Sequence, residues 1–364
     1  MRVGLLIYGS LDTLSGGYLY DRKLVSYLES RGDTVEIISF PWMNDVYHFA
    51  QNFKTEYYHK LINLKVDVLI QDELNFLSLV WLNRKIKKRV TYPIFALVHH
   101  LRSSEPVRNP FFGVFRWLEK SFLCSVDGFI FNSHATRKAV ESLSKVDKPS
   151  VVAYPSGARF EVKTTPEKIE QRAKMSPLQI LFVGNLIPRK GLHTLIRALT
   201  FLPSSDWSLK IVGDESVDPA YVDEAWTLVS RYCLMGQVQF LGKIKDKNLE
   251  NHYQNTHVLV VPSLYEGFGI VYLEAMAFGV VPMATEAGGA AEIIDQCING
   301  YLVTVEDPQA LANHIATLMK DRTQLARMGQ AALEKFDQFP SWEQTGETIR
   351  KFIVEQVYQN EETT

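Results

Sequence analysis

Two glutamates seven residues apart frame the segment EGFGIVYLE, which runs from Glu266 to Glu274. A buried apolar run ends at Pro262 and a helical pattern begins near Ile270, so a glycine-bearing turn joins a strand to a helix. Gly267 and Gly269 permit close backbone approach, and N–H groups at a helix start bind anions. Carboxylates accept hydrogen bonds from hydroxyl groups. The turn could hold a hydroxyl-rich anionic ligand; the alternative is ordinary helix capping, with glutamate favoured by the helix dipole.

A second segment, FVGNLIPRKGLHTLIRAL at 182–199, has the same strand–loop–helix order. Gly184 ends the apolar run, and Arg189 and Lys190 stand just before Gly191 and the helical pattern. A cation in this place could neutralise a diphosphate leaving group. The alternative is an exposed basic turn.

Three weaker patterns also follow apolar runs. SGG at 15–17 follows the first run, His99 ends IFALVHH, and EAGGAAEII covers 286–294. Taken alone they are a glycine turn, a histidine at a strand end and glycines that open a helix.

The elements that would position these residues are short apolar runs alternating with helical patterns. In the first half the predicted strands are 3–8, 34–40, 66–71, 94–100, 128–133 and 150–155; in the second they are 179–185, 208–214, 238–243, 257–263, 280–285 and 300–304. Continuous apolar runs separated by helices indicate parallel strands covered on both faces. The fold class is therefore α/β, with two Rossmann-like domains and a ligand cleft at the carboxyl ends of their strands.

A polar stretch at 156–177 is the predicted domain boundary. We expect an N-terminal domain over 1–160, a second domain over 175–340, and a C-terminal helix over 341–364. By pattern alone that helix could pack on either domain.

Composition narrows the class of protein. The chain has 364 residues, enough for two domains, and 46% are hydrophobic. Cys124, Cys233 and Cys297 have no paired spacing, so we expect reduced, mostly buried thiols. No window approaches the ~18 apolar residues of a membrane span, and the N-terminus lacks an export signal. The expected location is the cytoplasm or the cytoplasmic surface of a membrane.

The two motifs together resemble the retaining glycosyltransferases of family 4, which have the GT-B fold, and the resemblance runs from end to end. In that family the first glutamate, here Glu266, lies against the donor sugar, and the second, here Glu274, holds the ribose. The turn between them, matched by Gly267, Phe268, Gly269 and Ile270, faces the sugar or the phosphates. The resemblance implies that Lys190 binds the diphosphate of the donor.

The family's arginine in the lysine loop is Asn185 here, so the phosphate contact of that arginine would have to come from another residue, and Arg189 is the candidate. The resemblance also implies that Gly16 and Gly17 approach the donor phosphate and that His99 reaches the donor sugar. It places 287–290 near the cleft. It also implies that the domain over 1–160 takes the acceptor, that the domain over 175–340 takes the nucleotide-sugar donor, and that the tail helix crosses back to the first domain.

The implied reaction is transfer of a sugar from a nucleotide-diphosphate sugar, UDP- or GDP-linked, to an acceptor hydroxyl with retention. A double displacement would need a carboxylate nucleophile beside the anomeric carbon. The family's glutamates are not generally placed so, which implies a front-face mechanism driven by positioning and charge, with Glu266, His99 and Lys190 as the catalytic set. The chain has no Asp-x-Asp, so neither a metal nor any other cofactor is expected.

Other classes of protein fit less well. No G-x-G-x-x-G follows either leading strand, which argues against a nicotinamide oxidoreductase. A GT-B sugar epimerase and a catalytically idle nucleotide-sugar-binding protein stay open as alternatives.

The acceptor could be a glycan, a lipid or a small molecule. Residues 1–150 carry 20 Lys+Arg against 15 Asp+Glu, and the basic excess is strongest over 84–148. The segments 81–89 and 109–123 mix apolar or aromatic residues with cations, so they could lie on an anionic membrane; the alternative is that the aromatic residues are partly core. No recognition motif accompanies the basic excess, so nucleic acid is not an expected partner.

Overall fold

The computed structural model describes residues 1–13, 15–106, 111–160 and 164–361. The chain divides into two compact units. The first comprises Met1–Pro155 and Pro340–Thr364, and the second Ser156–Phe339. Within the described residues each unit has one six-stranded sheet in which every pairing is parallel, so the predicted α/β fold class with two Rossmann-like domains is confirmed. Residues 109 and 110 of the aromatic segment, 161–163 of the polar stretch and 362–364 of the tail lie outside the described residues.

The first unit has its strands in the order β2-β1-β3-β4-β5-β6. The strands are β1 Arg2–Tyr8, β2 Thr34–Phe40, β3 Val68–Asp72, β4 Ile94–Val98, β5 Gly128–Phe131 and β6 Ser150–Val152. The α-helices are α1 Gly16–Ser30, α2 Asp45–Ala50, α3 Thr55–Ile62, α4 Phe76–Leu79, α5 Leu82–Ile86, α6 Phe112–Ser125, α7 His134–Ser144 and α16 Trp342–Glu361. Short 3₁₀ turns are η1 Gln51–Phe53, η2 Glu73–Asn75 and η3 Arg102–Ser104.

Strand β1 shows why these apolar runs become central strands. Successive side chains of a strand point to opposite faces. Val3, Leu5 and Ile7 enter one buried cluster, which also holds residues of α1 and α16. Leu6 and Tyr8 enter the other cluster, with residues of α3 to α7. Because both faces are covered, nearly every position of the strand must be apolar.

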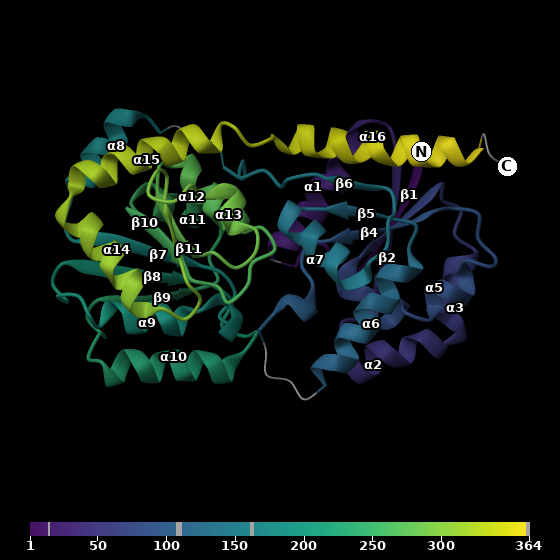
Figure 1. Ribbon diagram of the computed structural model, residues 1–364, viewed down its shortest axis with the longest axis horizontal. Helices are drawn as coiled ribbons and strands as arrows, with labels where there is room; N and C mark the ends of the chain where they lie inside the picture. The colour runs from purple at the N-terminus through teal and green to yellow at the C-terminus, as the bar shows by residue number, and fades with distance from the viewer. Residues whose placement is uncertain (14, 107–110, 161–163, 362–364) are drawn as a thin grey trace. The chain divides into compact units, whose positions relative to one another are not determined.

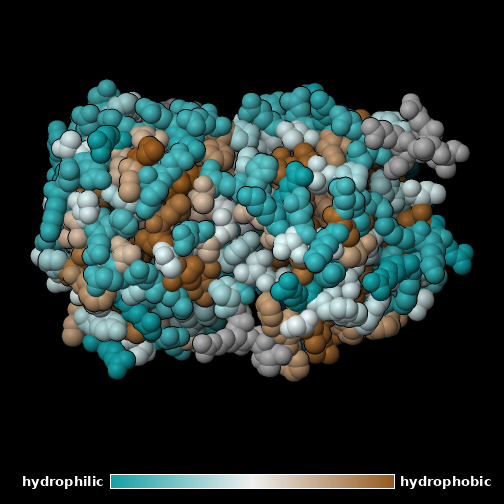
Figure 2. Space-filling model, in the orientation of Figure 1, coloured by the Kyte–Doolittle hydropathy of each residue, from teal (hydrophilic) through white to brown (hydrophobic). Residues whose placement is uncertain are grey.

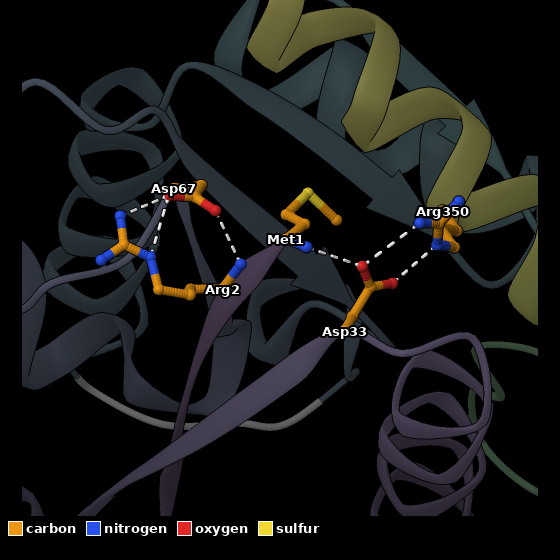
Figure 3. A network of polar contacts seen from close by, with 5 residues as sticks. All are labelled: Met1, Arg2, Asp33, Asp67 and Arg350. Carbon is orange, nitrogen blue, oxygen red and sulfur yellow. Dashed lines mark hydrogen bonds and ion pairs between the residues drawn. The ribbon is translucent and has the colours of Figure 1, made fainter.

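The C-terminal helix belongs to the first unit, as the family resemblance implies. In Figure 1 α16 (yellow) runs beside α1 and β6, and Ile349 and Ile353 are fully buried there. Figure 3 shows an ionic contact at the same place: Asp33 accepts hydrogen bonds from Arg350 Nε at 2.6 Å and from the nitrogen of Met1 at 3.0 Å. Burial raises the pKa of Asp33, but these two cations offset that and leave the pKa below its usual value.

Gly346 of α16 packs directly against Tyr27 of α1, and its replacement by alanine should destabilise the first unit. A Cβ at this position would lie 2.3 Å from Tyr27 Cγ, whereas at Gly113 in α6 no described atom lies within 4 Å. Overpacking costs about 1–3 kcal/mol, which exceeds the gain of about 1 kcal/mol in helix propensity. We expect G346A to unfold at lower urea concentration than wild type and G113A to match or exceed wild type. Equal midpoints for G346A and G113A would contradict the packing.

The second unit has its strands in the order β12-β11-β10-β7-β8-β9. The strands are β7 Leu178–Val183, β8 Trp207–Val212, β9 Val238–Gly242, β10 Val258–Val261, β11 Val281–Thr285 and β12 Tyr301–Val303. The helices are α8 Pro166–Ala173, η4 Pro188–Lys190, α9 Leu192–Leu199, α10 Pro219–Arg231, α11 Asp246–Gln254, α12 Ile270–Ala277, α13 Ala290–Ile293, α14 Pro308–Lys320 and α15 Arg322–Phe336. In Figure 1 α9 and α10 lie on one side of the sheet, and α8, α12 and α15 on the other.

Each sheet has one place where the strand order reverses. In the first unit the chain moves from β1 outward to β2 and returns to the other side of β1 with β3; in the second it moves from β7 to β9 and returns with β10. In open α/β sheets ligands bind at the carboxyl ends of the two strands that flank such a switch point. The expected sites are therefore after β1 and β3, and after β7 and β10.

The expectation that the cysteines are mostly buried is wrong, because Cys124, Cys233 and Cys297 are all exposed. Cys233 and Cys297 have positive φ, 56° and 63°, at turns on the surface. A hydrophobic side chain does not by itself bring a turn into the core. Among the described residues no helix is both long and apolar enough to span a membrane.

Candidate functional site

The switch point of the second unit brings together the two motifs of the sequence. The loop after β7 packs against the loop after β10 so closely that a Cβ on Gly191 would lie 2.0 Å from the carbonyl oxygen of Pro262. Gly191 also has φ +70°, so glycine is required there for two reasons. Leu264 donates its N–H to the carbonyl of Arg189 at 2.7 Å, and Arg189 Nη1 donates to the carbonyl of Tyr265 at 3.0 Å. These contacts fix the two loops to each other.

Lys190 and Glu266 form the ionic centre of this loop pair. Lys190 Nζ lies 2.6 Å from Glu266 Oε2, and Ser263 Oγ donates to the same oxygen at 3.1 Å. Both charged side chains are mostly buried, 14% and 13% exposed, so their interaction is screened less than on an open surface. An ammonium has three N–H donors, so the contact with Glu266 can coexist with a contact to an anion.

The Gly-Gly segment before α13 lies against Glu266. Glu266 donates its N–H to Ala287 O at 3.1 Å, and its own carbonyl accepts the N–H of Gly289 at 2.8 Å. Gly288 has φ +99°, and a Cβ there would lie 2.0 Å from Glu266 O. The family resemblance implies a place near the cleft for 287–290, and the tertiary structure adds that this segment contacts Glu266 directly.

The turn between the two glutamates begins α12 as predicted, with Gly269 as N-cap at φ +93° and Ile270 as first helical residue. Gly267 is buried, and the buried ring of Phe268 packs edge-on against Phe339, with centroids 6.0 Å apart. Asn185, at the family's arginine position, directly follows Gly184 at the end of β7 and is partly exposed. The predicted residues of the second unit thus flank one strand-end region.

Glu274, a residue of α12, belongs to a second network that also includes Tyr253 of α11 and Arg159. It is 1% exposed; Tyr253 Oη donates to its Oε2 at 3.0 Å, and Arg159 Nη1 donates to its Oε1 at 3.3 Å. Arg159 also pairs with Asp246 at 2.6 Å. Burial raises the pKa of Glu274, although Arg159 and Tyr253 act in the opposite direction. The carboxylate is held in a fixed orientation by two donors, which preorganises it for a further hydrogen-bond donor.

In the first unit the glycine turn and the predicted histidine lie side by side. Ser15 caps α1 by accepting the N–H of Tyr18, and the helix starts at Gly16. A Cβ on Gly17 would lie 3.2 Å from the His99 ring. His99 Nε2 lies 3.1 Å from Asp21 Oδ1, and the His99 N–H donates to Glu73 Oε2 at 2.8 Å. A histidine held by a carboxylate thus lies beside the N-terminus of a helix, a kind of position at which proteins can bind anions.

Three carboxyl groups surround His99, and all three are buried: Asp21, Asp72 and Glu73. Burial, followed by the charge of Asp21, raises the pKa of Asp72 to about 6, and burial raises that of Glu73 well above its usual value. Burial lowers the pKa of His99, but the hydrogen bond and charge of Asp21 reverse this, so the pKa is raised.

Asp21, Asp72 and His99 are also where a cation could bind. Their ligand atoms lie within 4.8 Å of one another, which is close enough for the three residues to hold a metal ion. Among the described residues this is the one group of His, Cys, Asp or Glu side chains that meets this condition. The hydrogen bond between Asp21 and His99 uses one ligand atom of each.

The buried acids predict a pH-dependent stability of the first unit. Asp72 binds its proton more tightly in the folded chain (pKa about 6) than in the unfolded chain (about 3.8), so stability falls as pH rises through this window. The raised pKa of His99 acts in the same direction, because the stability it contributes at low pH is lost as pH rises. We expect D72N, whose amide oxygen can still accept the N–H of Leu74, to be stabilised relative to wild type at pH 7 but not at pH 4. Urea unfolding at both pH values measures this, with D147N on the exposed surface as control. An equal difference at both pH values would refute the assignment.

Sequence reasoning missed Asp21, Asp72 and Glu73 in the first unit, and Arg159 and Tyr253 in the second. A signal existed for the acids, because Asp72 and Glu73 directly follow the predicted strand 66–71 and Asp21 falls on the buried face of α1. For Arg159 there was none, since it stands in a polar stretch without periodicity.

Comparison with known proteins gives one family match. Residues 164–335 match the family model described as Glycosyl transferases group 1. A curated relative, an uncharacterized glycosyltransferase of Methanocaldococcus jannaschii, is 36% identical over 143 residues, which cover 39% of this chain and 36% of the relative. The chain covers 36% to 58% of the length of the first curated relatives that it matches.

Solved structures match over nearly the whole chain. Sucrose-phosphate synthase from Thermosynechococcus elongatus superposes with a TM-score of 0.83 at 21% identity, covering 98% of this chain and 99% of that one. Anabaena HepE in complex with UDP-glucose gives a TM-score of 0.76 at 20% identity, covering 98% and 100%. At such identities the likeness establishes the fold. The chain thus has the two Rossmann-like units of the GT-B fold, and its residues 164–335 match the Glycosyl transferases group 1 family.

Proposed function

We propose that the protein is a retaining glycosyltransferase that moves a sugar from a UDP- or GDP-linked donor to an acceptor hydroxyl without a metal ion. The observation that carries the proposal is the Lys190–Glu266 pair at 2.6 Å, located at the switch point of the second unit where a ligand is expected. The family match covers this region, and one structural neighbour was solved with UDP-glucose.

In the proposed reaction Lys190 binds the diphosphate and neutralises the charge that develops as the bond from the anomeric carbon to the diphosphate oxygen breaks. A new bond forms from the acceptor oxygen to the anomeric carbon on the same face. The acceptor proton passes to the departing diphosphate. Glu266 orients the sugar, and Glu274 accepts hydrogen bonds from the ribose hydroxyls.

The surroundings of Glu266 favour this front-face mechanism over a double displacement. A nucleophilic carboxylate needs an oxygen directed at the anomeric carbon. Glu266 Oε2 already accepts hydrogen bonds from Lys190 and Ser263, which suits an orienting group. In the first unit, Gly16, Gly17 and His99 supply a helix N-terminus and an imidazole for the donor phosphate and sugar, as the family resemblance implies.

A thermal-shift panel of nucleotide sugars tests the donor assignment. A ligand at about 100 times its Kd adds about 2.7 kcal/mol of stability, which raises Tm by at least about 5 °C for a unit of this size. We expect such a shift with a UDP- or GDP-sugar, unchanged by EDTA. Turnover of that donor with an acceptor, followed by NMR of the product's anomeric proton, then tests transfer and retention. A shift without turnover would identify an idle binding protein, and isomerisation of the donor an epimerase.

We also propose that the first unit binds an anionic membrane surface on the cytoplasmic side. The segment 111–123 forms α6 and its start, where Phe111, Val114 and Trp117 are 64%, 54% and 52% exposed. The alternative that residues of this segment are partly core fits Leu118 and the aromatic Phe122, which are buried. Figure 2 shows hydrophobic residues gathered at the lower edge of this unit, where α2 and α6 lie in Figure 1.

The exposed aromatics continue into a neighbouring element. Trp117 contacts Trp81 with centroids 6.5 Å apart, and Trp81 contacts the 62% exposed Phe53 at 5.5 Å. Lys85 lies over the Phe53 ring at 5.3 Å. Aromatic residues flanked by cations are the composition that binds membrane interfaces.

Vesicle co-sedimentation tests this second proposal. We expect binding to phosphatidylserine vesicles at low salt, weaker binding at 0.5 M salt because the charges are screened, and little binding to phosphatidylcholine. W117A should reduce binding, whereas F201A, an exposed aromatic of the second unit, should not. Absence of binding to anionic vesicles at low salt would refute the proposal.

A further inference from the structure

A cavity of about 220 Å³ lies in the first unit. None of the site residues predicted from the sequence lines it. Its lining includes Tyr8 at the end of β1 and Glu73 directly after β3. These are the two strands that flank the switch point of the first sheet, so the cavity occupies the place where such a fold binds a ligand. The volume is below the range of about 300–1,000 Å³ that holds drug-sized ligands, and it suits a molecule the size of one sugar ring.

One wall of the cavity is aromatic, and contacts between its rings hold it in place. Tyr8 stacks on His48 with ring centroids 4.0 Å apart, and Trp42 meets Tyr8 edge-on at 5.6 Å. Trp42 is nevertheless 58% exposed, so part of its ring faces solvent. The negative face of an aromatic ring attracts the electropositive C–H groups on one face of a sugar ring.

Carboxyl groups supply the polar part of the cavity lining. Glu73, Glu119 and Asp45 all line the cavity. The first two are 4% and 2% exposed, and their backbone partners hold them in place: Glu73 accepts the N–H of His99, and Glu119 those of Arg102 and Ser103. A carboxyl oxygen accepts more than one hydrogen bond, so these groups can also receive sugar hydroxyls.

The basic residues of the lining are engaged by acids or are neutral. Arg102 forms a two-pronged ion pair with Asp45 at 3.0 and 3.1 Å, and His100 lies 2.8 Å from Glu105. His48 Nε2 accepts the N–H of Met43 at 2.9 Å, and burial lowers its pKa. The described lining therefore offers an anion no cation that is not already paired or neutral, so a phosphate that enters the cavity gains no new ion pair to offset the loss of its hydration.

We propose that this cavity is the acceptor subsite and that it takes an uncharged or amino sugar ring, stacked on Trp42 and hydrogen-bonded to the buried carboxyl groups, while it rejects phosphorylated sugars. The assignment to an acceptor rests on the proposed glycosyltransferase function; the sugar preference rests on the cavity alone.

Ligand-observed saturation-transfer NMR on the full chain, without donor, tests the preference. The probes are methyl α-glucoside, glucosamine and glucose 6-phosphate. We expect the first two to bind and the phosphate to bind at least about tenfold more weakly. W42A should lose most of the signal, and W117A, which replaces a tryptophan of similar exposure (52% against 58%) in the same unit outside the cavity, should keep it.

A charge variant sharpens the test. D45N leaves Arg102 without its carboxylate partner, so the discrimination against glucose 6-phosphate should shrink while methyl α-glucoside still binds. Equal or tighter binding of the phosphate by wild type, no binding of either uncharged or amino sugar, or equal signals from W42A and W117A would overturn the proposal. Failure of the nucleotide-sugar panel with retained sugar binding would instead refute the proposed transfer reaction and leave this site standing.

Discussion

Replacing Lys190 by methionine will lower kcat/KM for sugar transfer by about 10²–10³, the usual effect of removing one preorganised charge-stabilising donor. The ammonium is mostly buried and held 2.6 Å from Glu266. It therefore needs little movement to stabilise the negative charge that develops on a leaving diphosphate. Methionine keeps the length of the side chain but removes the charge. Steady-state rates with the donor found in the thermal-shift panel measure the effect.

The matched control is K320M, which removes an exposed lysine at the end of α14. It should keep wild-type activity. K190M should also bind UDP more weakly than wild type, yet bind uridine equally well, because only the diphosphate contact is lost. Wild-type turnover by K190M would refute the role of Lys190.

Replacing Glu274 by glutamine will weaken donor binding by about 10–100-fold, since hydrogen bonds to a charged group contribute about 1.5–3 kcal/mol. The carboxylate is oriented by Tyr253 and Arg159 and is buried in α12. Because its proposed ligand is the ribose, E274Q should weaken uridine, UDP and the nucleotide sugar alike. Isothermal titration with these three ligands separates this pattern from that of K190M.

The structure shows why alanine is a poor choice at this position. E274A would leave Tyr253 and one arm of Arg159 unpaired in the interior, which costs about 1–3 kcal/mol for a buried polar group. Y253F is the better control, because it removes a contact of the carboxylate without touching the proposed ligand. It should lower stability and change uridine affinity less than E274Q does. Unchanged uridine affinity in E274Q would refute the ribose assignment.

Much of the fold could be predicted from local sequence. Runs such as 3–8 and 178–183 must be buried on both faces, and only a parallel sheet covered by helices does this. The turn at 267–269 and the helix start at Ile270 were also readable, because glycine and helix-start patterns act over a few residues. The burial of the cysteines was predicted wrongly, since exposure of a turn depends on what packs around it.

The site was only partly readable. The sequence by itself determined that a glutamate pair, a lysine loop and a Gly-Gly segment each follow an apolar run. Only the tertiary structure decided that Lys190 meets Glu266, that Gly288 packs on Glu266, and that Arg159 and Tyr253 hold Glu274. The same holds for Asp21 beside His99. The reason is physical: strand and helix signals depend on neighbours in sequence, whereas the order of strands in a sheet decides which distant loops meet at its edge.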